Sequence, residues 1–205
     1  MIEELADKNC DIQAVVERGI NSSNILTELL EALKSKKETI RYNSFKILDK
    51  ISELDPTLLY QHWDHFAKML DSKKALDKHA AVYILANLTY VDNQMRFEKL
   101  FHKFYELLND KSIIPPSHVA LNSAKIIKAK PQLEQKITNK LLAIDKSGHE
   151  KERKDLIKSY IITAFDQYYE MSKSKKKIRN FAEKQLECRS PKTRRVASEF
   201  LKNHQ

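Results

Sequence analysis

The sequence predicts an all-α protein, and three observations support this prediction. Only two glycines and five prolines occur in 205 residues, whereas β-rich and α/β folds need glycine at turns and phosphate-binding loops. Leu, Lys, Ala, Glu and Ile dominate the composition, and these residues suit helices. Apolar residues recur every three or four positions, which is the spacing of an amphipathic helix with one wet face.

The length of the chain favours one domain over residues 1–205, because 205 residues can bury a sizeable core. No apolar run approaches the roughly 18 residues that span a membrane. The acidic N-terminal stretch lacks the basic and apolar regions of a secretory signal. Cys10 and Cys188 lie at opposite ends of the chain, so we expect reduced thiols rather than a disulfide. We therefore expect a cytoplasmic protein that makes no contact with a membrane.

The N-terminal third predicts a short helical segment followed by a helical hairpin. Residues 2–20 form one helix or two short ones, which end at Gly19 and the polar residues after it. Ser22 or Ser23 is a good N-cap for the next helix. Apolar stripes over residues 25–33 and 40–54 predict two helices joined by a polar turn at 34–37. Pro56 ends the second helix and suits the first turn of the next.

The rest of the chain predicts four more hairpins, which gives about ten helices after the N-terminal segment. The second hairpin has stripes at 58–70 and 76–88, with a polar turn at 71–74. The third has stripes at 95–108 and 119–127, and its turn at 109–111 is lengthened by Pro115 and Pro116. The fourth has stripes at 133–144 and 156–168. A very basic stretch at 171–177 then leads to the last pair, at 178–186 and 190–201.

The second helices of these hairpins repeat a pattern of a basic residue, a small residue and an apolar residue. A third copy at Ser123 and Ile127 requires the Pro-Pro turn to be an insertion, and the fourth copy, around Ile161 and Phe165, is the weakest. A period near 40 residues with two helices per unit is typical of a helical repeat array. The three matching copies are Arg41, Ser44 and Leu48; Lys78, Ala81 and Leu85; and Arg194, Ala197 and Leu201.

This pattern resembles HEAT-type, armadillo-like repeat proteins over residues 22–205, with residues 1–21 as an N-terminal capping segment. The resemblance rests on the leucine pairs of the first helices, the polar turns with Asp71 or Asp110, and the basic residue followed by a small one. Tetratricopeptide arrays would read similarly, but the period of 37–42 suits HEAT repeats better. The resemblance implies an α–α superhelix, a HEAT-like solenoid of about five hairpins. Small residues at Ser44, Ala81, Ser123 and Ala197 would let neighbouring helices approach closely.

The positive charge of the chain is concentrated in its C-terminal half. The formal net charge is +9. Residues 1–55 hold 8 Lys and Arg against 11 Asp and Glu, whereas residues 151–205 hold 15 against 7. This asymmetry indicates an acidic partner for the C-terminal half. A merely solvated, lysine-rich surface is the alternative.

The basic residues of that half are the best candidates for a binding site. In a HEAT stack the second helices line the concave face, so the resemblance implies a basic row that could contact phosphates or an acidic peptide. The candidate residues of this basic face are Lys125, Lys128, Lys154, Lys158, Lys173, Lys175, Lys176, Lys177, Arg179, Lys192, Arg194 and Arg195.

Other candidate sites have stronger structural explanations. His62 and His65 have a spacing that can bind metal, but an ordinary helix whose Trp63 packs inward explains them better. Asp166 and Glu170 lie one turn apart, which suits either paired carboxylates or a solvated charged face. Arg189 could lower the pKa of Cys188 modestly, although no histidine partner is evident.

Aromatic residues raise two further alternatives. Phe97, Phe101, Phe104 and Tyr105 could form a groove, but their spacing indicates core first. Tyr168 and Tyr169 could stack on bases or simply end a helix. Glycine-based phosphate loops are essentially excluded by the two glycines.

We therefore predict a non-enzymatic HEAT-repeat scaffold that binds a protein partner, possibly acidic, along its concave surface. The alternative is nucleic-acid binding through the basic C-terminal half, and less favoured still is an enzyme similar to DNA alkylation-repair glycosylases. We expect no cofactor, no metal and no catalytic residue. The sequence predicts no oligomeric state.

Overall fold

The computed structural model describes residues 1–204, and within them the secondary structure is helical with no strand. The all-α class is therefore confirmed. The α-helices are α1 (Ile2–Ala6), α2 (Ile12–Ile20), α3 (Ser23–Ala32), α4 (Glu38–Leu54), α5 (Thr57–Tyr60), α6 (Trp63–Met69), α7 (Ala75–Leu88), α8 (Arg96–Glu106), α9 (Ile114–Ala129), α10 (Glu134–Leu142), α11 (Lys151–Tyr168), α12 (Lys175–Glu183) and α13 (Pro191–Asn203). Short 3-10 helices are η1 (Thr89–Val91), η2 (Leu107–Asn109), η3 (Pro131–Leu133), η4 (Ala143–Lys146) and η5 (Tyr169–Met171).

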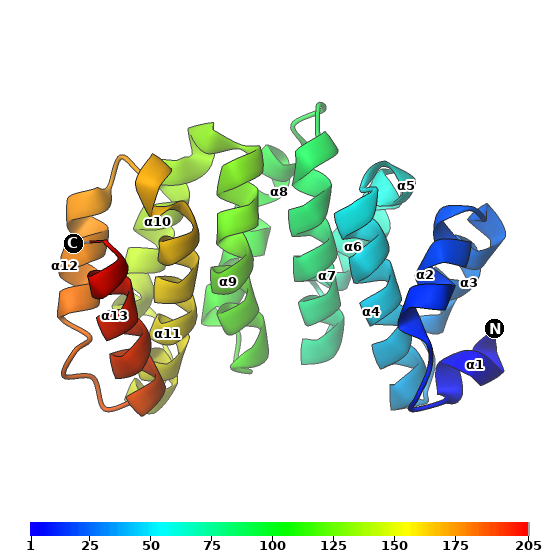
Figure 1. The fold of residues 1–205 in the computed structure, drawn as a ribbon, viewed down its shortest axis with the longest axis horizontal. Helices are drawn as coiled ribbons and strands as arrows, with labels where there is room; N and C mark the ends of the chain where they lie inside the picture. The colour runs from blue at the N-terminus through cyan, green and yellow to red at the C-terminus, as the bar shows by residue number, and fades with distance from the viewer. Residues whose placement is uncertain (205) are drawn as a thin grey trace. The chain divides into compact units, whose positions relative to one another are not determined.

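The helices form two compact units, Met1–Gln94 and Met95–Gln205. In unit 1, α4 lies at the centre and packs against α1, α2 and α3 on one side and α7 on the other. Helix α6 packs against α7 (Figure 1). The buried core of this unit includes Val15, Leu29, Ile47, Phe66 and Leu85.

In unit 2, α9, α11 and α13 lie side by side in one layer, and α8, α10 and α12 lie behind them (Figure 1). We call α9, α11 and α13, and likewise α4 and α7 of unit 1, the second helices of their hairpins. The helices α8, α10 and α12 are first helices. Phe104, Ile127, Ile137, Phe165 and Phe200 are among the buried side chains between the layers.

Polar side chains cap the N-termini of several helices, including one cap that the sequence predicts. The Ser22 hydroxyl accepts a hydrogen bond from the backbone N–H of Ile25, so the predicted cap of α3 is confirmed. Asp11 and Ser190 cap α2 and α13 in the same way. Gly19 lies in the last turn of α2 next to α4, and a Cβ at this position would lie 2.7 Å from the Ile51 Cδ1 atom.

The same hydrogen bond to a serine hydroxyl occurs in three of the turns between paired helices. The hydroxyls of Ser35, Ser72 and Ser112 each accept a hydrogen bond from the backbone N–H two residues later, at 3.2, 3.1 and 3.3 Å. In the first of these turns the Arg41 guanidinium donates to the carbonyl oxygens of Ser35 and Lys36, at 2.7 and 2.9 Å. These bonds satisfy backbone groups that the helix ends leave without partners.

The small residues of the predicted repeat are all fully buried: Ser44, Ala81, Ser123 and Ala197. Two of them also satisfy their own hydroxyls within the helix, because Ser44 donates to the Ile40 carbonyl and Ser123 to the Val119 carbonyl. The close approach of helices expected at these positions is consistent with their burial.

Two predicted elements are wrong in detail. The stripe at 58–70 forms two helices, α5 and α6, rather than one. Where α5 ends, the hydroxyl of Tyr60 donates to Asp92 at 2.7 Å. A tertiary contact of this kind cannot be predicted from apolar periodicity. Pro115 and Pro116 do not lengthen the third turn but lie in the first turn of α9, where proline loses no helical hydrogen bond.

Candidate functional site

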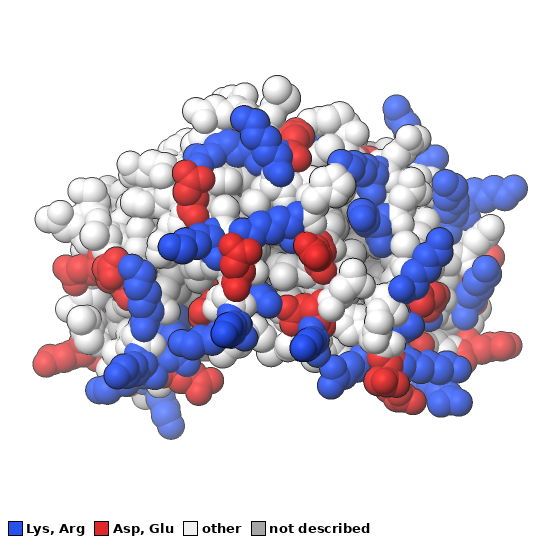
Figure 2. Space-filling model, turned by 180° about the vertical axis from the view of Figure 1, so that it is seen from behind, with Lys and Arg blue, Asp and Glu red and all other residues white. Residues whose placement is uncertain are grey.

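The basic residues predicted as one face lie on two different layers of unit 2. Five of them surround the start of α12, which is a first helix: Lys173, Lys175, Lys176, Lys177 and Arg179. The other seven lie on the second helices α9, α11 and α13: Lys125, Lys128, Lys154, Lys158, Lys192, Arg194 and Arg195. Figure 2 shows basic side chains interspersed with acidic ones over much of the face that carries the first helices.

Two lysines of α11 have structural roles. Lys158 is buried, and its ammonium group lies 2.8 Å from an Asp145 carboxylate oxygen and 3.6 Å from one of Asp155. Lys154 donates to the Asp145 carbonyl at 3.0 Å. The expectation that Lys158 belongs to an exposed basic row is therefore wrong, because its charge is needed to pair with the buried Asp155.

Arg194 also has a structural role. Its guanidinium donates to the carbonyl oxygens of Cys188 and Arg189, at 2.6 and 3.0 Å. These carbonyls precede Arg194 by six and five residues, which is also the geometry of Arg41 in the first hairpin. Arg194 thus fixes the turn before α13, and this use of its donors explains the basic residue in two of the three matching copies, at Arg41 and Arg194.

The exposed side of the second helices in unit 2 mixes aromatic and basic groups. The Lys192 ammonium lies 3.8 Å from the centre of the Tyr160 ring, and that ring lies 6.0 Å from the His118 ring. Burial is the main cause that lowers the pKa of His118, and the nearby Lys192 charge lowers it further. Lys128 and Arg195 are exposed and Lys125 is half-buried on the same helices.

The basic residues around α12 divide by the side of the helix they occupy. Lys175 pairs with Glu170 at 2.7 Å, and Arg179 pairs with Glu183 at 3.1 Å. Lys173, Lys176 and Lys177 form no ion pair within residues 1–204 and line a cavity of about 470 Å³. We call this cavity the α12 pocket; Gln135, Asn139, Ser174 and Asn180 complete its lining.

The histidines and carboxylates considered as candidate sites have structural surroundings instead. His62 lies before α6 while His65 lies within it, and no group of three or more His, Cys, Asp or Glu side chains in residues 1–204 is arranged to hold a metal ion. Asp166 and Glu170 both contact the His204 ring, at 2.9 and 3.2 Å.

Neither cysteine has the character of an activated nucleophile. Burial raises the pKa of Cys188, so the expected lowering by Arg189 is wrong, and the Asp155 carboxylate raises it further. Burial also raises the pKa of Cys10. Both thiols are free.

The predicted aromatic alternatives are core residues. Phe97, Phe101, Phe104 and Tyr105 are buried, so the core interpretation is confirmed and the groove is not formed by them. Tyr168 and Tyr169 are buried as well. Neither tyrosine can stack on a base, because its ring already packs on Phe165 or Phe200.

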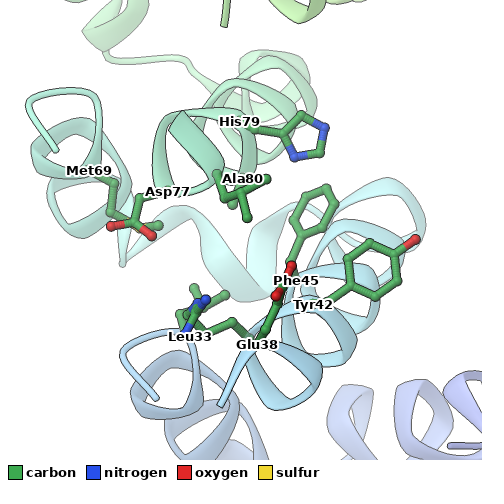
Figure 3. A pocket seen from close by; sticks show the side chains of 10 residues that line it. Leu33, Glu38, Tyr42, Phe45, Met69, Asp77, His79 and Ala80 are labelled. Carbon is green, nitrogen blue, oxygen red and sulfur yellow. The ribbon is translucent and has the colours of Figure 1, made fainter. Parts of the chain in front are cut away.

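A second cavity, which the sequence did not indicate, lies between α4 and α7 in unit 1 (Figure 3). It has a volume of about 200 Å³. We call it the α4–α7 pocket. Its lining residues are Leu33, Glu38, Arg41, Tyr42, Phe45, Met69, Leu76, Asp77, His79 and Ala80.

The α4–α7 pocket combines an apolar wall with three charged residues, the acidic Glu38 and Asp77 and the basic Arg41. Tyr42 and Leu76 are 56% and 46% exposed. The Phe45 ring packs edge-on against the His79 ring, with 4.8 Å between centroids. Figure 3 shows the Glu38 side chain on the α4 side and Asp77 on the α7 side of the pocket.

No protein-family model, curated protein or solved structure matches this chain. Within residues 1–204, no helix is both long enough and apolar enough to cross a membrane.

The α4–α7 pocket can bind an apolar side chain by burying it against Tyr42, Phe45 and Leu76. Its size decides between two kinds of ligand. Sites for drug-sized molecules occupy about 300–1,000 Å³, whereas this cavity suits one large side chain. The sequence did not indicate this pocket, because Tyr42 lies outside the predicted apolar stripe of its helix and Leu76 was counted in the buried stripe at 76–88, although it is 46% exposed. Their meeting depends on how α4 packs on α7.

Proposed function

We propose that this chain is a HEAT-type helical-repeat protein that binds a segment of a partner protein at the α4–α7 pocket and has no catalytic role. The observation that carries the proposal is the exposed apolar wall of that pocket, where Tyr42 and Leu76 leave about half of their surface in water. Exposed apolar surface gathered around a cavity is typical of a protein-binding site.

The repeat assignment rests on interactions that recur at matching positions. Arg41 and Arg194 donate to carbonyls six and five residues earlier. The serine turns at Ser35, Ser72 and Ser112 recur at intervals of 37 and 40 residues. In a HEAT-type solenoid the second helices line the concave surface, so the proposal assigns the α4–α7 pocket to that surface.

The chemistry of the pocket specifies the partner segment. Its apolar wall selects a side chain such as Leu, Met or Phe, which gains roughly 1.5–3 kcal/mol when fully buried. Glu38 is exposed and forms no ion pair within residues 1–204, and Asp77 accepts a hydrogen bond from Ser72. Arg41 also lines the pocket, but its guanidinium already donates to the turn carbonyls of Ser35 and Lys36. Glu38 and Asp77 therefore favour a lysine or arginine next to the apolar anchor.

The overall charge of unit 1 agrees with a basic partner segment. Residues 1–94 hold 12 Lys and Arg against 15 Asp and Glu, while residues 95–205 hold 25 against 13. The partner that binds unit 1 is thus of opposite charge to the one expected for the C-terminal half.

Nucleic-acid binding by the basic half has weaker support. Lys154, Lys158 and Arg194 are used within the fold, and the remaining basic residues are divided between two layers. The tyrosine pair that could stack on bases, Tyr168 and Tyr169, is buried.

Selection of random displayed peptides on the whole protein tests the proposal. We expect enriched peptides to share one large apolar residue beside a lysine or arginine. They should lose binding to Leu76→Ser and keep binding to Leu54→Ser, because Leu54 is also strongly exposed, at 55% against 46% for Leu76, but lies outside the pocket. Enriched peptides that bind both variants alike, or that share no apolar anchor, would contradict the proposal.

A further inference from the structure

The α12 pocket of unit 2 brings three cations together without a carboxylate in its lining. Lys173, Lys176 and Lys177 share the cavity with the amide side chains of Gln135, Asn139 and Asn180. Figure 2 shows a group of basic side chains with no acidic one among them where the N-terminal end of α12 lies. All three lysines are exposed, and an anion bound among like charges would lower their mutual repulsion.

The neighbouring acidic groups do not neutralise these lysines. Glu170 pairs with Lys175, and Glu183 pairs with Arg179. Glu134 is buried, and one of its oxygens accepts hydrogen bonds from the hydroxyls of Thr138 and Ser172. The fold therefore supplies a carboxylate partner for two of the five cations near α12 and none for the three that line the pocket.

The position of the lysines on α12 adds to the cost of leaving the pocket empty. Lys176 and Lys177 lie in the first turn, which contains no acidic residue, and no side chain caps this helix. The N-terminus of a helix carries partial positive charge and favours an anion, so lysines there are unfavourable. The lysines at the start of α12 therefore lower the stability of the fold, and residues that lower stability are common at binding sites.

We propose that the α12 pocket binds a phosphate dianion carried by a phosphorylated serine or threonine of a partner protein. Three ammonium groups can donate charge-assisted hydrogen bonds to the phosphate oxygens, and the three amides can bond to the peptide on either side. A nucleic-acid strand fits less well, because no aromatic side chain lines the cavity to stack on a base. This site lies in unit 2, so its failure would leave the α4–α7 pocket proposal intact.

Fluorescence anisotropy with a labelled Ala-Ala-phosphoserine-Ala-Ala peptide tests this inference on the whole protein. We expect saturable binding that inorganic phosphate competes away, and no binding of the same peptide with serine. The double variant Lys176→Gln/Lys177→Gln should bind at least tenfold more weakly. The double variant Lys184→Gln/Lys202→Gln makes the same change in net charge outside the pocket, and it should bind within twofold of the unaltered protein.

Three results would overturn the inference: equal losses in the two double variants, equal binding of the unphosphorylated peptide, or tighter binding of a twelve-residue oligothymidine that displaces the phosphopeptide. A thermal unfolding measurement guards against misfolding. Because the lysines oppose the helix dipole, Lys176→Glu should raise the melting temperature of the free protein while abolishing phosphopeptide binding. A variant that loses both stability and binding would contradict the proposed role of these charges.

Discussion

Tyr105 and Tyr168 are buried tyrosines whose hydroxyls lie next to other hydroxyls. The Tyr105 hydroxyl lies 3.1 Å from the Ser123 hydroxyl, and that of Tyr168 lies 2.8 Å from the Thr138 hydroxyl. Burial raises the pKa of both tyrosines above the ordinary value near 10, although each hydrogen bond opposes the rise. Their hydroxyls therefore serve as buried hydrogen-bonding groups rather than as acids.

These two tyrosines should make the fold sensitive to alkali. Because their pKa is raised in the folded state, their contribution to stability is complete below about pH 10 and is lost as pH rises further. Each pH unit above that point should cost about 1.4 kcal/mol per tyrosine. Absorbance at 295 nm should show both groups ionising only as the chain unfolds. In Tyr105→Phe, one late-titrating group should disappear, and a smooth titration of all tyrosines in the folded protein would contradict this account.

Met95 is the one residue other than glycine with positive φ within residues 1–204, at φ 52° and ψ 37°. Left-handed backbone costs a residue with a Cβ about 1–2 kcal/mol, and asparagine tolerates it better. Its side chain is 62% exposed, so little packing is lost on substitution. We expect Met95→Asn to raise the free energy of unfolding by about 0.5–1 kcal/mol in urea titrations. The β-branched Met95→Ile should lower it, and equal stability of the two variants would argue against strain at this position.

At the scale of single elements, the turn before a second helix is the unit that recurs. Arg41 and Arg194 each bind two carbonyl oxygens of the preceding turn. The sequence revealed the recurrence of the basic residue but not its use, because the turn carbonyls carry no sequence signal. The same limit applies to Lys158, whose helical position indicates exposure but whose pairing with Asp145 and Asp155 depends on the packing of α11.

The arginine turns predict a matched pair of stability effects. Arg41→Met and Arg194→Met should each lower the free energy of unfolding by about 1–2 kcal/mol, since each removes charged hydrogen bonds to two carbonyls. Arg195→Met is the control, because Arg195 is exposed and adjacent in sequence, and surface changes of this kind usually stay within about 0.5 kcal/mol. Urea denaturation measures all three. If Arg195→Met is as damaging as Arg194→Met, the turn contacts are not what stabilises the hairpin.

For the molecule as a whole, apolar periodicity predicted the helices well but did not predict the two pockets. Apolar periodicity located most helices to within a few residues, since it follows directly from burial of one face, as at Ile47 or Phe104. The residues that line the two pockets were harder to predict, because each pocket depends on which solvent-exposed helix faces lie next to each other. Lys173 and Lys177 were predicted as residues of a basic binding face and are exposed, but only tertiary packing puts them in a cavity with Asn139 of α10.

The division of charge between the two units suggests two kinds of partner contact for one chain. Unit 1 offers an apolar pocket with the acidic residues Glu38 and Asp77. Unit 2 offers a pocket with Lys173, Lys176 and Lys177. A basic, apolar segment for the first and a phosphorylated segment for the second would both be properties of protein partners, which is the function proposed for the chain.

The most direct test compares two tyrosines of unit 1 that are exposed to the same degree. Tyr42 lines the α4–α7 pocket and is 56% exposed, while Tyr90 is 54% exposed and lies outside the pocket. Isothermal titration calorimetry with a peptide selected on the unaltered protein should show at least tenfold weaker binding to Tyr42→Ser, because buried aromatic anchors commonly contribute about 2 kcal/mol or more. Binding to Tyr90→Ser should be unchanged. Equal dissociation constants for Tyr42→Ser and the unaltered protein, or an equal loss with Tyr90→Ser, would contradict the proposal that the α4–α7 pocket binds the partner.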